Sequence, residues 1–161
     1  GGSAAAGIGV LYAARGIGAG IGPILARAWL GQQPDEMRRA IAPSYFLVSV
    51  FYLMLSWSPT ILLASTAVIG AHAAGSVLWV FSTVLLQMSV PDRFRGRVFS
   101  AELALLMIIS AASSYACAYA MDAWGMSPFT LTRVLGVVFV LPAVGWLLIE
   151  RKHFGDRPRA L

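Results

Sequence analysis

Five long apolar runs, separated by short polar or Pro/Gly-containing breaks, constrain this chain more than any other feature of its sequence. The 161 residues are 58% apolar and only 12% charged, whereas soluble domains average about 45–50% and about 25%. Because so few charges cannot coat a protein in water, most outward-facing side chains must meet hydrocarbon. The composition therefore excludes a soluble globular domain, a disordered tail and a secreted disulfide scaffold, and it predicts an all-α integral membrane protein.

A helix needs about 20 residues to cross a bilayer core. Cutting the chain at its breaks predicts five transmembrane helices, at approximately residues 4–30, 41–57, 59–90, 98–121 and 133–149. The third is long, but its halves would be too short to span, so we expect one helix that projects beyond the membrane at its C-terminal end. Residues 1–150 would form one helical bundle, and residues 151–161 a basic tail. Since the chain begins without Met or a basic leader, we expect it to be a piece of a longer protein.

Basic residues alternate along the connections between these spans. The first connection contains two arginines, the third contains three, and the tail contains four basic residues, while the other two connections contain none. The positive-inside rule then places the basic side and the C-terminus in the cytoplasm, and the bundle in the plasma (inner) membrane. The arginines form no basic face interleaved with aromatics, so the net charge of +5 does not indicate nucleic acid.

Metal, disulfide and cofactor motifs are missing from the sequence. Cys117 is the single cysteine, and His72 and His153 are too far apart for an HExxH-type pair. The glycines of the first span miss the GxGxxG spacing at its last position. We therefore expect no cofactor and no metal site.

A polar stripe runs along the third predicted helix. At 100° per residue its members share a sector of roughly 60°; they are Ser65, His72, Ser76, Thr83 and Gln87. One interpretation is a water-accessible pathway for a substrate or ion, in which His72 could carry a proton. The other is hydrogen bonding to a neighbouring helix.

Arg15 and four glycines mark the first predicted helix. An arginine at mid-membrane costs several kcal/mol unless it is paired or hydrated. Because no carboxylate lies at mid-membrane in these spans, Arg15 could bind an anionic substrate group or a partner from elsewhere, or else snorkel to an interface. The glycines form two small-xxx-small pairs on different faces, suited to close packing or sliding against neighbours; they are Gly16/Gly20 and Gly18/Gly22.

The remaining spans differ in bulk. The second and fifth are bulky and apolar almost all round, so we expect them to be outer, lipid-facing helices, and we expect Pro142 to kink the fifth. The fourth carries a small-residue face suited to close contact or a cavity wall, which consists of Ser110, Ser113, Ser114 and Cys117.

The segment VPDRFRGRVFS at residues 90–100 closely resembles the loop before the eleventh helix of major facilitator superfamily transporters, especially drug- and siderophore-exporter-like members. Residues 12–23 likewise resemble their eighth helix. The resemblance covers nearly the whole chain, as helices eight to twelve of a twelve-helix fold, and implies that the first, third and fourth spans border a central cavity. The family loop GxxxDRxGRR matches only at Gly22 and Arg27, since its aspartate and second glycine are absent here.

Residues near the basic end are the candidates for conformational control. Asp92 can cap the fourth helix and Gly96 permits a sharp turn. Arginines of the same segment can bond helix carbonyls and headgroups; these are Arg93, Arg95 and Arg97. Glu102 lies near the same face and can contact Arg27 at the end of the first span and Arg38 and Arg39 of the first connection. The alternative is a plain positive-inside loop.

The resemblance implies a fragment of a secondary active transporter, with a partial major-facilitator-type bundle that moves a small solute by alternating access, in the direction of export. The expected partners are membrane lipids, the solute and the missing N-terminal helices of the same polypeptide. One alternative is a structural or degenerate half-protein without transport activity. Another is an intramembrane enzyme, but the paired carboxylates or His clusters of such enzymes are absent from the predicted spans, so we expect no enzyme.

Overall fold

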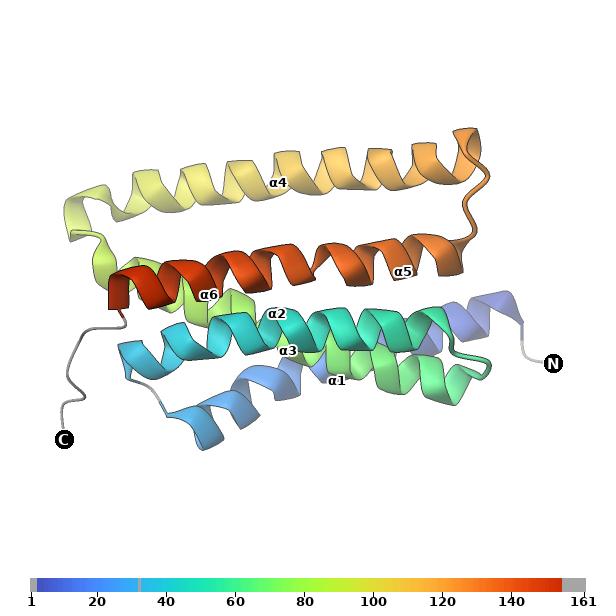
Figure 1. The fold of residues 1–161 in the computed structure, drawn as a ribbon, viewed down its shortest axis with the longest axis horizontal. Helices are drawn as coiled ribbons and strands as arrows, with labels where there is room; N and C mark the ends of the chain where they lie inside the picture. Colours follow the sequence, from blue (N-terminus) through green and yellow to red (C-terminus); the bar gives the residue numbers. More distant parts are fainter. Residues whose placement is uncertain (1–2, 32, 155–161) are drawn as a thin grey trace.

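A computed structural model describes residues 3–31 and 33–154, and within them the chain folds into helices joined by short connections (Figure 1). The helices are α1 (Ala4–Leu30), α2 (Pro34–Ser56), α3 (Ile61–Ser89), α4 (Asp92–Ala123), α5 (Pro128–Val138) and α6 (Val140–Phe154). α5 and α6 follow one another along a single path (Figure 1). The described residues thus contain five helical segments long and apolar enough to cross a membrane, which confirms the predicted number.

Successive segments run in opposite directions (Figure 1). The connection between α1 and α2, the connection between α3 and α4, and the end of α6 therefore lie at one end of the bundle. Most of the Arg and Lys residues lie in the helical turns beside these points, namely Arg27, Arg38, Arg39, Arg93, Arg95, Arg97, Arg151 and Lys152. The predicted gathering of basic charge at one end is therefore confirmed. We call this the basic end.

The predicted range of the first helix matches α1, and α3 is one continuous helix, as expected. By contrast, α2 begins at Pro34, seven residues before the predicted start. Gln33 and Glu36 form a capping box, in which the backbone N–H of Gln33 donates to Glu36 Oε2 at 3.0 Å. Because a capping box and a proline in the first turn both favour helix initiation, the helix begins among charged residues outside the apolar run.

The start of α4 corrects two predictions. Gly96 lies inside the helix, so the expected sharp turn at this residue is wrong. Asp92 does not cap the helix, because the N-cap is Pro91 and no side chain bonds there. Instead, Asp92 Oδ1 pairs with Arg95 Nη2 at 3.0 Å one turn along, in the first turn where the helix dipole favours negative charge.

The expectation that the second span is an outer helix is also wrong. α1 and α2 both pack on α3, and α2 additionally packs on α5 and α6, whereas α4 contacts α5 only near their connection. Small buried residues on two opposite faces allow α2 to approach its neighbours closely, with Ala40 and Ser44 on one face and Ala42 and Ser49 on the other. The sequence prediction weighed the bulky residues at 46–53 and missed these two faces.

The last crossing is interrupted at Phe139, between α5 and α6. Pro142 lies three residues beyond it and has no N–H to donate to the carbonyl of Val138, which weakens the helix at this point. This confirms a break in the fifth span next to Pro142. α6 extends to Phe154, so the predicted tail begins as helix, and its residues 155–161 lie outside the described residues.

Candidate functional site: a cationic cavity between α1 and α3

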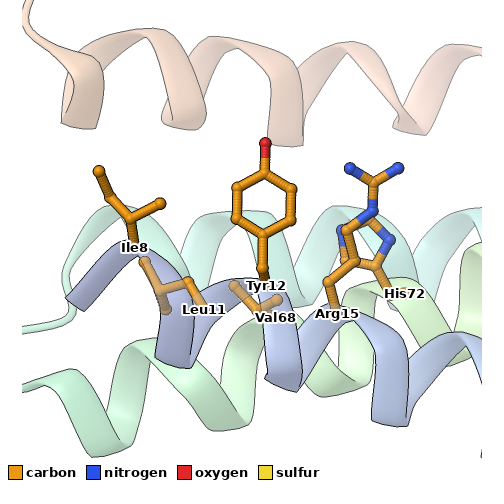
Figure 2. A pocket seen from close by; sticks show the side chains of 6 residues that line it. All are labelled: Ile8, Leu11, Tyr12, Arg15, Val68 and His72. Atoms are coloured by element: carbon orange, nitrogen blue, oxygen red, sulfur yellow. The ribbon is translucent and has the colours of Figure 1, made fainter. Parts of the chain in front are cut away.

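Arg15 lies near the middle of α1 and faces a cavity of about 270 Å³ between α1 and α3. The cavity is lined by one face of α1 and one face of α3, with Ile8, Leu11, Tyr12, Arg15, Val68 and His72. Figure 2 shows the Arg15 guanidinium, the His72 ring and the Tyr12 hydroxyl directed to the same side of these two helices. The cavity is thus lined by apolar side chains and by three polar groups that point to the same side.

No described residue forms a hydrogen bond or an ion pair with the Arg15 guanidinium. Eleven residues of α3 precede His72, which lines the same cavity, so at 1.5 Å per residue His72 lies roughly 17 Å from the start of α3. Half of a membrane core is about 15 Å, so a bundle that spans a bilayer holds this cavity near the bilayer centre. An arginine at that depth costs roughly 2.5–3.5 kcal/mol even with local adjustment, which favours a specific anionic partner.

Side chains from two further helices lie within electrostatic range of this group. Arg15 interacts electrostatically with His72 of α3 and with Tyr52 of α2, and Tyr52 interacts in the same way with Cys117 of α4. Arg15 is therefore within electrostatic range of one side chain of α2 and one side chain of α3. Sequence reasoning missed Tyr12 and Tyr52. Tyr12 could have been found, because it precedes Arg15 by three residues and so shares its helix face.

The polar stripe of α3 divides into parts with different surroundings. His72 lines the cavity, and Gln87 is exposed at the basic end. The hydroxyls of Ser65 and Thr83 are buried and have no hydrogen-bond partner among the described residues. At these two positions the described residues therefore form none of the hydrogen bonds between helices that one interpretation of the stripe predicts. Ser76 is half-buried.

One of the two glycine pairs makes the contact between α1 and α3. Gly18 lies against the backbone of Ile69, and Gly22 lies against the backbone of Ala73. In contrast, Gly16 and Gly20 have no atom of another segment near the position that a Cβ would occupy. The Gly18/Gly22 pair thus holds α1 against α3 beside the cavity, and the Gly16/Gly20 pair faces away from the described helices.

The basic-end candidates lie on α4, except Arg27 on α1, and among the described residues they form no cluster of ion pairs between helices. Arg93 stacks over the ring of Phe94 at 4.6 Å, and Arg95 pairs with Asp92. Glu102 forms no ion pair within the described residues, so the expected contact with the arginines of the first connection is not formed there. Arg38 instead pairs with Asp35 at 2.7 Å. The other three candidates, Arg27, Gly96 and Arg97, are exposed.

No protein-family model matches the chain, and no curated protein or solved structure matches it either.

Proposed function

We propose that this chain is the C-terminal part of a major-facilitator-type secondary transporter, which exports a small solute by alternating access. In this proposal α1, α3 and α4 correspond to helices eight, ten and eleven, and the basic end faces the cytoplasm of a cell with a plasma (inner) membrane. The N-terminal helices of the same polypeptide would complete the pathway. No cofactor is required.

The observation that carries the proposal is the unpaired guanidinium of Arg15 at mid-helix, which shares a cavity with His72. A cation at this depth is stabilised by an anion, and a binding site near the bilayer centre is where alternating access places its solute. The imidazole of His72 and the hydroxyl of Tyr12 add hydrogen-bonding groups that can orient the bound group. The cavity suits the anionic part of an otherwise apolar solute.

Two features support a moving rather than a rigid bundle. Gly18 and Gly22 let α1 contact α3 without intervening side chains, and such a surface permits small displacements of one helix along the other. α4 packs on other described helices only near its connection to α5, so it is free to change its packing between states.

The test compares cells that express the complete protein with cells that lack it, by measuring small-molecule pools inside and outside the cells with mass spectrometry. We expect at least one organic anion to be depleted inside expressing cells, and Arg15→Gln to abolish that depletion. Arg15→Lys should retain part of it, because the charge remains. The matched control is Arg133→Gln: Arg133 lies at the other end of the bundle, over the Trp57 ring at 4.9 Å.

Unchanged export by Arg15→Gln at normal expression would remove Arg15 from the mechanism. If cells that express wild type or Arg15→Gln have the same small-molecule pools as cells that lack the protein, transport is rejected. The alternative of a structural half-protein without transport activity is then the better proposal.

A further inference from the structure

A second and larger cavity lies toward the basic end of the bundle, away from Arg15. It is a groove of about 720 Å³ between the C-terminal part of α1 and residues 36–51 of α2, and its floor is α3. Pro23 lies inside α1 at the beginning of this stretch, where a missing N–H permits a bend. Figure 1 shows the C-terminal half of α1 turning away from α2 before the short connection. The groove is the space left by this divergence.

The walls of the groove are hydrocarbon over most of its length. Leu25 of α1 and Leu47 of α2 line it, and both are more than 40% exposed. The floor is made of small residues of α3 such as Ala73 and Ala74. Exposed leucines beside a smooth floor form a surface that an alkyl chain can cover, because such contacts depend on shape and on apolar area.

The length of the groove corresponds to one leaflet. Along α2 it extends from Glu36 to Phe51, and fifteen residues at 1.5 Å each give about 23 Å. One leaflet of a bilayer, with its headgroup region, is about 20–22 Å thick. At the inner end the Phe51 ring lies directly against Gly70. A transmembrane helix would need a groove of the full bilayer length, so this one fits an acyl chain better.

One cation is free at the outer end of the groove. The carboxylate of Glu36 lines that end, but it accepts the Gln33 N–H at 3.0 Å. The neighbouring Arg38 is engaged with Asp35 at 2.7 Å. Arg39 also lines the groove and forms no hydrogen bond or ion pair with any described residue. The N-terminus of α2 adds partial positive charge at the same level.

We propose that this groove binds one membrane phospholipid from the leaflet at the basic end, with an acyl chain along α3 and the phosphate on Arg39. An arginine matches a phosphate with two parallel hydrogen bonds. Trp29 lines the same end and is 82% exposed, and tryptophan favours the headgroup level of a bilayer. The proposal needs only a membrane-embedded bundle, so it is independent of the transport function.

The test uses the complete protein in phosphatidylcholine vesicles that contain a few per cent of a phosphatidylglycerol with a diazirine at the end of one acyl chain. After illumination, cross-linked peptides are mapped by mass spectrometry. We expect higher cross-linking on the groove peptide that contains Leu47 and Phe51 than on α4, whose exposed apolar residues report ordinary boundary lipid. Arg39→Gln should lower the groove signal about fivefold, the effect of one basic residue at a headgroup, and leave the α4 signal unchanged.

Three further variants separate the headgroup from the groove. Arg39→Lys should restore most of the signal, and Arg151→Gln, at the same end but outside the groove, should change nothing. Leu47→Trp should lower the groove signal with Arg39 intact, because the larger ring fills the space. Equal cross-linking of the groove and α4, or a groove signal that Arg39→Gln leaves unaltered in correctly folded protein, would overturn the proposal.

Discussion

Gly22 of α1 lies against the backbone of Ala73 in α3, at a separation that leaves no room for a Cβ atom. Gly18 makes the same contact with Ile69 one turn earlier. Between these two positions in the sequence is Gly20, which has open space around it. One helix thus carries glycines that are required for packing and a glycine that is not, and the difference can be measured.

Gly22→Ala should destabilise the bundle, because the added methyl group meets the backbone of Ala73 and forces α1 away from α3. Overpacking of this kind costs roughly 1–3 kcal/mol. Thermal unfolding of the purified protein in detergent measures the effect, and Gly20→Ala is the matched control. The control should stay within about 1 kcal/mol of wild type or gain stability, since alanine is the better helix former. Equal losses in both variants would mean that the contact between α1 and α3 is not the one described.

The interpretation of the α3 stripe as a water-accessible pathway makes a prediction at Ser76, which is half-buried near His72. In a background in which the single native cysteine is replaced, Cys117→Ala, the variant Ser76→Cys should react with an aqueous thiol reagent in at least one transport state. The measurement is labelling in vesicles with and without an applied proton gradient. Ser49→Cys, at a position only 3% exposed in α2, should stay protected. Complete protection of Ser76→Cys in both conditions would reject the pathway.

The number and order of the crossings could be read from the sequence, because apolar runs of sufficient length are spaced by charges and by Pro/Gly breaks. The residues at which α2 and α4 begin could not be predicted in this way. Asp35, Glu36 and Arg38 resemble a loop when only charge is considered, yet the capping box and Pro34 begin a helix before them. Residues 92–97 also resemble a charged loop but begin a helix, because arginine is a good helix former and Asp92 suits a first turn.

The candidate site was partly predictable for a similar reason. Arg15 stood out because a charge at mid-span is rare. The residues that share its cavity could not be found in the same way, because they depend on which face of α1 packs against α3. Gly18 and Gly22 make that contact, but Gly16 and Gly20 have the same spacing, so the sequence alone does not show which pair packs. The position of α2 between α3 and α5 was missed because its small residues are interspersed with large ones.

Gly96→Ala tests the helical start of α4. Gly96 lies inside the helix, and nothing lies within 4 Å of the position that a Cβ would occupy. The substitution should therefore leave the protein folded and raise its stability by up to about 1 kcal/mol. Thermal unfolding checks this result, with Gly125→Ala as the contrasting variant, because Gly125 has a φ of +62° that disfavours alanine. A large loss at Gly96 and none at Gly125 would indicate that the turn lies at Gly96 after all.

Trp146 joins the last crossing to the start of α2. Its indole Nε1–H donates to the backbone carbonyl of Arg38 at 3.0 Å, across 108 residues of sequence. Trp146→Phe keeps most of the ring and removes the donor, so it should cost about 1 kcal/mol, the usual net value of a hydrogen bond. Thermal unfolding measures the loss. Trp79→Phe, in the exposed part of α3, is the control and should have little effect. Since the bond lies at the basic end, spin labels on α2 and α6 should also show a broader distance distribution in Trp146→Phe. An unchanged distribution, with the same unfolding temperature as the control, would show that this bond does not hold α6 against α2.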